Sequence, residues 1–224
     1  MRIIRNIAFV LSLLGTLYLN GQEQEMTAVL DSVRNQLDRI KAYEVDATFR
    51  VDIDFVNMPE KQARIQFTSP DKVDVKTDGF LMIPKIGIRP MTRQMDLENY
   101  HSLYLGQEMV DGENCHIFKL IPKKKNSKIV LSTIWINQDY LIRKWESFTK
   151  NSGSILLEFS YEDLILPAEI IFSFEVSGMN IPIKYFGSEI EVDKKGMKET
   201  ENIEGKVFVS FRNYSIEYET GAGQ

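Results

Sequence analysis

The chain has 224 residues, of which 43% are hydrophobic, 11% aromatic and 26% charged. This balance is typical of a globular protein and excludes disordered, collagen-like and disulfide-scaffold chains. Lys and Arg number 27 against 32 Asp and Glu, a formal net charge of −5, so the basic composition of a nucleic-acid-binding protein is missing. A single cysteine, Cys115, excludes an intramolecular disulfide and a cysteine-rich zinc site.

Residues 1–21 have the pattern of a cleavable signal peptide. Arg2 and Arg5 precede an uncharged, mostly apolar run at 7–19, which is too short to span a bilayer as a helix. Gly21 offers a small residue for cleavage, and the alternative is an uncleaved membrane anchor. We therefore expect export to the periplasm. We also expect one domain over 22–220 and a frayed tail at 221–224.

The first element after the signal peptide is a predicted helix over 23–41. Its apolar residues recur every three or four positions, which gives one apolar stripe that needs a partner surface. The stripe consists of Met26, Val29, Leu30, Val33, Leu37 and Ile40.

From residue 44 onward the apolar period changes from 3.6 to 2, which predicts strands. Apolar and polar residues alternate over 44–56, so this strand is expected to have one apolar face and one solvated face. Further alternating runs, separated by Pro, Gly and Asn turns, continue to residue 218. Among them we expect a turn at Asp111-Gly112 and a register slip at Arg212-Asn213, as in a β-bulge. The charged stretch 193–205 is expected to be a hairpin tip.

The segment 79–100 breaks this pattern. It contains two prolines, two glycines and three methionines, and it is too apolar for a solvated loop. We expect a flap over an apolar surface, with a short helix near 91–98.

These elements predict a mainly β (α+β) fold. About ten strands joined by short turns, with no alternation of strands and helices, indicate an antiparallel sheet. A sheet with one apolar face must curl or be covered. The expected fold is an incomplete antiparallel β-barrel curled around the N-terminal helix and a short helical lid.

Several stretches, in their order along the chain, resemble the LolA-like periplasmic lipoprotein carriers, the family of outer membrane lipoprotein-sorting proteins. They are YEVDATFRVDI after the helix, IQFTSPDKVDVKTDG, DGENCHIFKLIPKKK, IWINQDYLIRKWES and GKVFVSFRNYSIEYE. The resemblance implies a half-barrel whose concave side is plugged by helices and holds acyl chains. Proteobacterial carriers have an arginine before the proline where this chain has Ser69, so the gating role of that arginine is not carried over.

Catalytic chemistry is not indicated. There is no nucleophile elbow, dinucleotide fingerprint, phosphate loop or zinc-protease motif. Cys115 and His116 are neighbours on a predicted strand and should point to opposite faces. The acidic pairs Asp52/Asp54 and Glu217/Glu219 are expected to be solvated. The run KKKNSK at 123–128 is expected to be a solvated turn, with attraction of anionic headgroups as the alternative. We expect no enzyme activity, catalytic residue, metal or cofactor.

The main hypothesis is a periplasmic carrier that binds acyl chains of lipoproteins or lipids in an apolar cavity and moves them towards the outer membrane. Its partners would be the lipidated cargo and a membrane-bound donor or acceptor protein, with no nucleic acid. One alternative is a lipid- or lipoprotein-sensing regulatory protein of the same fold, and another is a β-domain that binds a protein partner without a ligand cavity. The expected cavity residues are Val33, Leu37, Phe49, Val51, Ile53, Phe67, Phe80, Met82, Met91 and Met95.

Overall fold

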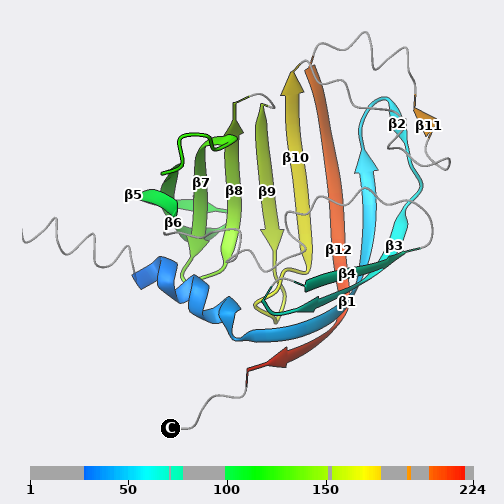
Figure 1. The fold of residues 1–224 in the computed structure, drawn as a ribbon, viewed down its shortest axis with the longest axis horizontal. Coiled ribbons are helices and arrows are strands. Elements are labelled where there is room, and N and C mark those ends of the chain that lie inside the picture. Colours follow the sequence, from blue (N-terminus) through cyan, green and yellow to red (C-terminus); the bar gives the residue numbers. More distant parts are fainter. Residues whose placement is uncertain are drawn as a thin grey trace, which may run out of the picture.

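An open, curved antiparallel sheet with a helix packed on one face forms the molecule (Figure 1). The computed structural model describes residues 28–70, 72–77, 99–150, 153–177, 191–192 and 202–219. A helix at 28–38 comes first. The strands that follow are β1 (Ile40–Asp52), β2 (Val56–Asn57), β3 (Lys61–Thr68), β4 (Lys72–Thr77), β5 (Tyr100–Val110), β6 (Glu113–Pro122), β7 (Ile129–Asn137), β8 (Ile142–Thr149), β9 (Ser154–Ser160), β10 (Glu169–Ser177), β11 (Glu191–Val192) and β12 (Asn202–Tyr218).

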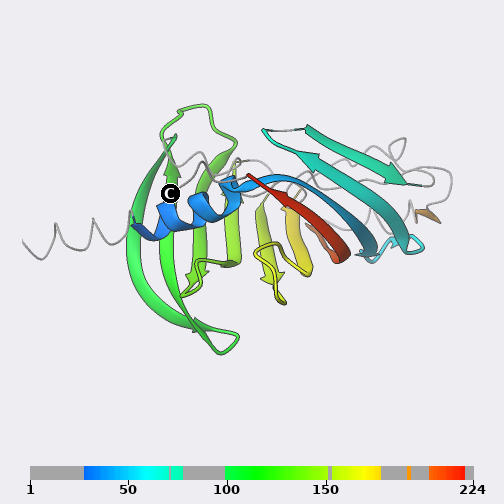
Figure 2. The same cartoon turned by 90° about the horizontal axis from the view of Figure 1, so that it is seen from below.

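Ten of these strands pair in the order β4-β3-β1-β12-β10-β9-β8-β7-β6-β5, and β2 pairs with β11. Every pairing in the large sheet is antiparallel, and β4 and β5 lie at its two unjoined edges. Seen from below, the sheet is an arc with β5 and β6 on one side and β3 and β4 on the other (Figure 2). The predicted incomplete antiparallel barrel is therefore confirmed, whereas the predicted lid lies outside the described residues.

The alternation in β1 explains how the sheet divides into an inner and an outer face. Tyr43, Val45, Ala47 and Phe49 are buried on the inner face, the side that carries the main core. Asp46 lies between them on the outer face, where the Arg64 guanidinium of β3 pairs with its carboxylate at 2.8 Å. The polar residues of β1 thus remain near water while the apolar ones build the core.

One predicted turn and one predicted β-bulge are confirmed in detail. Asp111 and Gly112 both have positive φ, 49° and 84°, as a two-residue hairpin turn between β5 and β6 requires. The register of β1 with β12 shifts between Glu44 and Asp46, and Asn213 has a φ of 58°. This is the bulge expected at Arg212-Asn213, because asparagine tolerates the left-handed conformation better than most residues.

Three predicted boundaries are wrong. The helix ends at residue 38, and Lys41 already belongs to β1, because pairing with the end of β12 gives these residues a backbone partner. The strand expected over 44–56 ends at Asp52, and the chain turns back through an Ile53–Val56 bridge. Residues 202–205 belong to β12, where they pair with the end of β10, and not to a hairpin tip.

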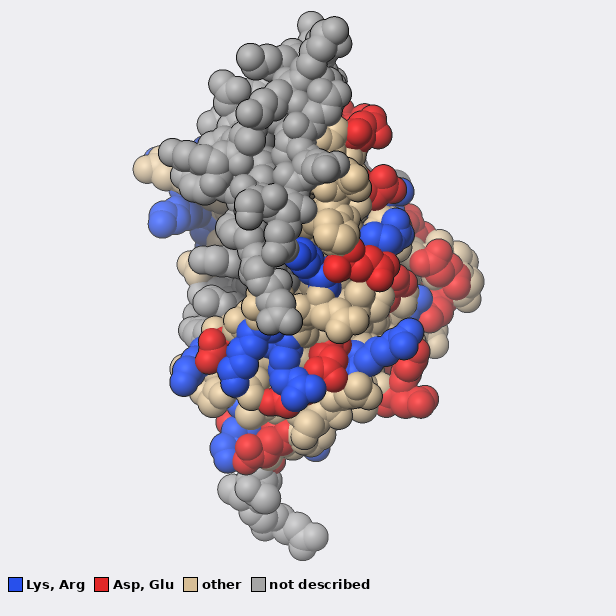
Figure 3. All heavy atoms as spheres, turned by 90° about the vertical axis from the view of Figure 1, so that its right-hand side faces the viewer, with Lys and Arg blue, Asp and Glu red and all other residues tan. Residues whose placement is uncertain are grey.

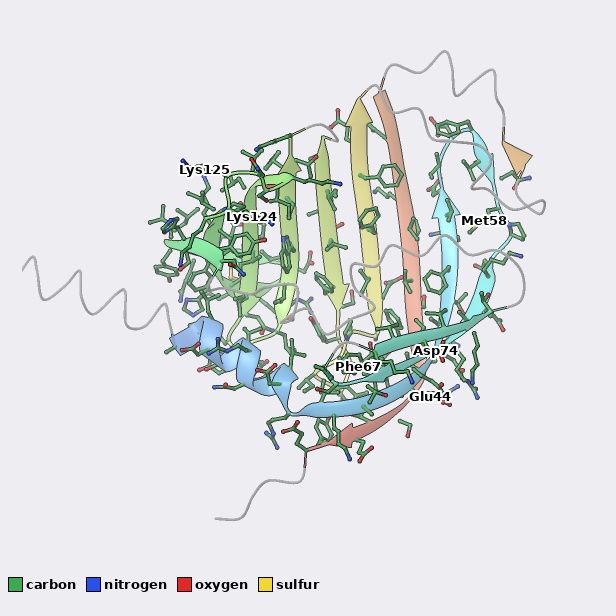
Figure 4. All side chains as sticks on the ribbon, in the orientation of Figure 1. Glu44, Met58, Phe67, Asp74, Lys124 and Lys125 are labelled. Atoms are coloured by element: carbon green, nitrogen blue, oxygen red, sulfur yellow. The ribbon has the colours of Figure 1, made fainter. Side chains whose placement is uncertain are left out.

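The turn after β1 leads into a small satellite core at the end of the sheet remote from the helix. Phe55 and Val56 are buried there against partly buried Ile53, Met58 and Phe174 (Figure 4). Gly205 of β12 borders this cluster. A Cβ at this position would lie 2.6 Å from carbons of Ile53 and Phe174, so the close approach requires glycine.

Candidate functional site

The apolar stripe of the helix packs on the inner face of the sheet. Val29, Leu30 and Val33 are buried in the same core as the inner-face residues of the strands, and Leu37 packs against that core. The helix is oriented by the chain that follows it, because β1 continues directly from residue 40 into the middle of the sheet. The predicted helix–sheet contact is thus present in the described part.

A small apolar cavity lies between this helix and the sheet. Its volume is about 30 Å³, roughly a tenth of that of the smallest ordinary ligand pockets. Its lining residues come from the helix, from five strands, from the turn between β7 and β8 and from the 161–167 segment. They are Val33, Gln36, Leu37, Tyr43, Tyr140, Leu141, Ile142, Phe159, Tyr161, Ile165, Leu166, Pro167, Ile170, Phe211 and Tyr214.

The phenols around the cavity are polar groups with internal partners. The Tyr161 hydroxyl donates to the Ile142 carbonyl at 3.0 Å, and the Tyr214 hydroxyl donates to the Pro167 carbonyl at 2.9 Å. Burial raises the pKa of both phenols, and also that of Tyr43, far above the ordinary value of 10.0. These phenols therefore stay neutral near pH 7, and the cavity has no anionic group from them.

One side of the cavity opens near the turn between β7 and β8. Tyr140 lines the cavity and is 39% exposed, so it reaches from the cavity to solvent. The Gln36 side-chain amide of the helix donates to the Asp139 carbonyl of the same turn at 3.1 Å. This polar contact joins the helix to the sheet at the rim of the cavity.

The residues expected to form the site lie in different places. Val33 and Leu37 line the cavity. Phe67 stacks on the cavity-lining Tyr43, with ring centroids 5.2 Å apart, and Phe49 is buried in the main core. Val51 contacts both cores, and Ile53 belongs to the satellite core. Phe80, Met82, Met91 and Met95 lie outside the described residues, so their place in the site stays a prediction.

The sequence does not distinguish most of the cavity wall from ordinary core. Phe159, Ile170 and Phe211 are alternating apolar residues of strands, and nothing in the alternation separates the two roles. The cavity-lining tyrosines also carry no sequence pattern that separates them from ordinary core. A buried aromatic residue next to an irregular, proline-containing segment such as 161–167 is the one pattern that could have indicated this region.

Cys115 and His116 do not form a catalytic pair. Cys115 is fully buried on the outer face in a cluster with Ile117 and Trp135. His116 is on the other face, where its Nδ1 lies 3.1 Å from the Tyr104 hydroxyl. The expectation that the two neighbours point apart is confirmed. Burial, together with the nearby Glu113 carboxylate, raises the pKa of the Cys115 thiol to about 11, so it is mostly protonated at neutral pH.

The described residues hold no group of three or more His, Cys, Asp or Glu side chains arranged for a metal ion. Within the same part of the chain, no helix has the length and apolar character required to cross a bilayer.

Comparison of the fold with solved structures identifies similar proteins. An outer membrane lipoprotein-sorting protein domain from Vibrio parahaemolyticus is 12% identical, with 87% of this chain and 93% of that chain covered and a TM-score of 0.52. A DUF1329 family protein from Desulfovibrio piger is 15% identical, with coverages of 88% and 94% and a TM-score of 0.49. A LolA superfamily protein from Nitrosomonas europaea is 9% identical, with coverages of 87% and 94% and a TM-score of 0.48.

The likeness to the Vibrio domain shows a shared fold, the open half-barrel of a lipoprotein-sorting protein domain. No protein-family model matches the sequence, and no curated protein is similar to it in sequence.

Proposed function

We propose that this protein is a non-enzymatic periplasmic carrier that binds the acyl chains of lipoproteins or lipids between helix 28–38 and the sheet. The observation that carries the proposal is the apolar cavity under the helix, lined by residues such as Leu37, Phe159 and Ile170. The shared fold with a lipoprotein-sorting protein domain supports the same class of cargo.

The size of the cavity determines how cargo would enter. About 30 Å³ is roughly a tenth of the smallest ordinary ligand pocket, so the cavity does not accommodate a long acyl chain. An acyl chain therefore requires the helix to move away from the sheet, so that its place on the inner face becomes available. The inner-face residues Tyr43, Phe159 and Phe211 would then contact the chain instead of Val33 and Leu37.

The energies of the two states are of similar size. Burying an acyl chain of about 14 methylenes contributes about 11 kcal/mol at 0.8 kcal/mol for each methylene. Withdrawing the three buried residues Val29, Leu30 and Val33 costs about 5–9 kcal/mol, at 1.5–3 kcal/mol for each side chain. The free energy gained by burying the acyl chain is thus close to the free energy lost by withdrawing the helix, which permits both loading and release.

The remaining parts of the proposal concern the pathway. Export by a signal peptide at 1–21 would place the protein in the periplasm, and transfer would run towards the outer membrane. A membrane-bound donor or acceptor would exchange cargo with it. Phe67, which stacks on the cavity-lining Tyr43, and Phe49, which is buried in the same core, would extend the binding surface once the helix has moved.

Native mass spectrometry tests the proposal. The purified protein is measured before and after extraction with organic solvent, and again after incubation with a diacylated lipopeptide. We expect a lipid-sized adduct that extraction removes and lipopeptide restores, at one ligand per chain. A bare mass under all three conditions would show that the fold binds no acyl chain.

A further inference from the structure

The turn between β6 and β7 concentrates positive charge at one end of the sheet. It contains the lysine run at 123–128, and Lys124 and Lys125 lie near this end of the sheet (Figure 4). The turn is held in place by backbone bonds, because the Lys150 amide donates to the Lys128 carbonyl at 2.9 Å and the Ser127 amide donates to the Lys124 carbonyl at 3.1 Å. Lys150, which follows β8, joins the same cluster, and its Nζ donates to the Lys125 carbonyl at 3.1 Å.

Within the described residues, the stretches of β5–β8 at this end carry no acidic side chain. Residues 99–107, 117–135 and 147–157 include no Asp or Glu, although the whole chain has a net charge of −5. The nearest carboxylate on β8 is that of Glu146, further towards the middle of the sheet. By contrast, the face at the right-hand side of Figure 1 carries Lys, Arg, Asp and Glu interspersed (Figure 3).

Exposed apolar side chains lie directly beside the lysines, on the outer face. Ile121 pairs with His101 across β5–β6, and Phe148 pairs with Leu131 across β7–β8. Leu103, Ile121 and Phe148 expose 54%, 45% and 41% of their surface. Strands of one sheet hold these residues at fixed spacing, and Val130, 49% exposed, lies at the edge of the same group.

A basic rim around exposed apolar side chains is complementary to a membrane surface that carries negative charge. The apolar groups enter the boundary between headgroups and acyl chains, while the lysines remain among the phosphates. We propose that this end of β5–β8 is a docking surface for the interface of an anionic phospholipid bilayer. It lies on the outer face, away from the cavity, so the inference goes beyond the carrier function and does not depend on it.

Vesicle sedimentation tests this proposal. Vesicles of phosphatidylcholine with about 30% phosphatidylglycerol are compared with pure phosphatidylcholine vesicles. We expect clear partitioning onto the anionic vesicles only, weakened as the salt concentration rises. The triple variant Lys124→Gln, Lys125→Gln, Lys128→Gln should lower the partition coefficient about 100-fold, since each lysine near such a surface contributes about fivefold.

A matched control removes the same charge elsewhere. Lys72→Gln, Lys76→Gln and Lys206→Gln change exposed lysines of β4 and β12 and should leave partitioning unchanged. Ile121→Ser with Phe148→Ser should lower partitioning at both low and high salt, while thermal unfolding verifies that each variant is folded.

Three results would overturn the proposal: equal partitioning onto neutral and anionic vesicles, an equal loss in the control triple variant, or binding to acidic protein without binding to either vesicle. Cargo binding is measured separately, so failure here leaves the carrier proposal intact.

Discussion

Shortening Val33 to alanine weakens the contact between the helix and the sheet without adding a polar group. Val33 is 3% exposed and lines the cavity. The change removes two methyl groups, about 1.6 kcal/mol of burial, and alanine returns up to about 0.6 kcal/mol through its higher helix propensity. With a small term for the enlarged cavity, the free energy of unfolding should fall by about 1–2 kcal/mol.

The same change should strengthen cargo binding. If an acyl chain has to displace the helix, each kcal/mol removed from helix docking is regained on loading. Val33→Ala should therefore raise acyl-ligand affinity by about tenfold, the equivalent of about 1.4 kcal/mol. Denaturant unfolding measures the first quantity, and titration with a fluorescent fatty acid measures the second.

The control is a destabilising change away from the helix. Ile65 of β3 is fully buried in the core but does not line the cavity, and Ile65→Val should cost a similar 0.5–1.5 kcal/mol. Its affinity for the ligand should stay unchanged. A fall in affinity for Val33→Ala, or an equal rise for Ile65→Val, would refute displacement of the helix.

Three further outcomes follow from the fold. Phe49→Asp should prevent folding, because Phe49 is 1% exposed on the inner face, whereas Asp52→Asn on the exposed face should leave the melting temperature nearly unchanged; equal effects would mean a wrong strand register. Burial raises the pKa of the Cys115 thiol to about 11, so at pH 8 only about one thousandth of this thiol is ionised in the folded protein. Cys115 should therefore react with a thiol reagent only on unfolding, and rapid labelling of the native protein would contradict its burial. The Asn213 side-chain amide donates to Asp46 Oδ2 at 3.0 Å and holds the pKa of Asp46 below its ordinary value of 3.8. The stability that this bond contributes should be lost as pH falls through the lowered folded-state pKa, and Asp46→Asn should flatten that part of the plot of unfolding free energy against pH.

The fold was accessible from the sequence because one signal dominates it. Alternation in stretches such as 43–49 determines which face is buried, and turn residues such as Asp111-Gly112 mark where strands reverse. Boundaries were less accessible, since Ile40 fits the helix stripe and a strand equally well. Its assignment to β1 depends on pairing with Tyr218, a residue far away in the sequence.

The cavity could not be located in the same way. It forms where the helix crosses β8–β10, and that crossing depends on β1 lying beside β12 in the sheet. Tyr43, Phe159 and Phe211 become neighbours only through this strand order. The alternation pattern places Phe159 and Phe211 on the apolar faces of their strands, but periodicity within one strand carries no information about which strands are adjacent.

A disulfide between the helix and the sheet tests the central claim most directly. Gln36→Cys with Asp139→Cys places two thiols at residues that already meet, since the Gln36 side-chain amide lies 3.1 Å from the Asp139 main-chain carbonyl, and buried Cys115 should not compete. Affinity for a diacylated lipopeptide is measured in the oxidised protein and again after reduction, with the disulfide verified by mass. The account predicts no binding in the oxidised form and full binding once the bond is reduced. Equal binding in both forms would contradict a carrier that loads by moving its helix.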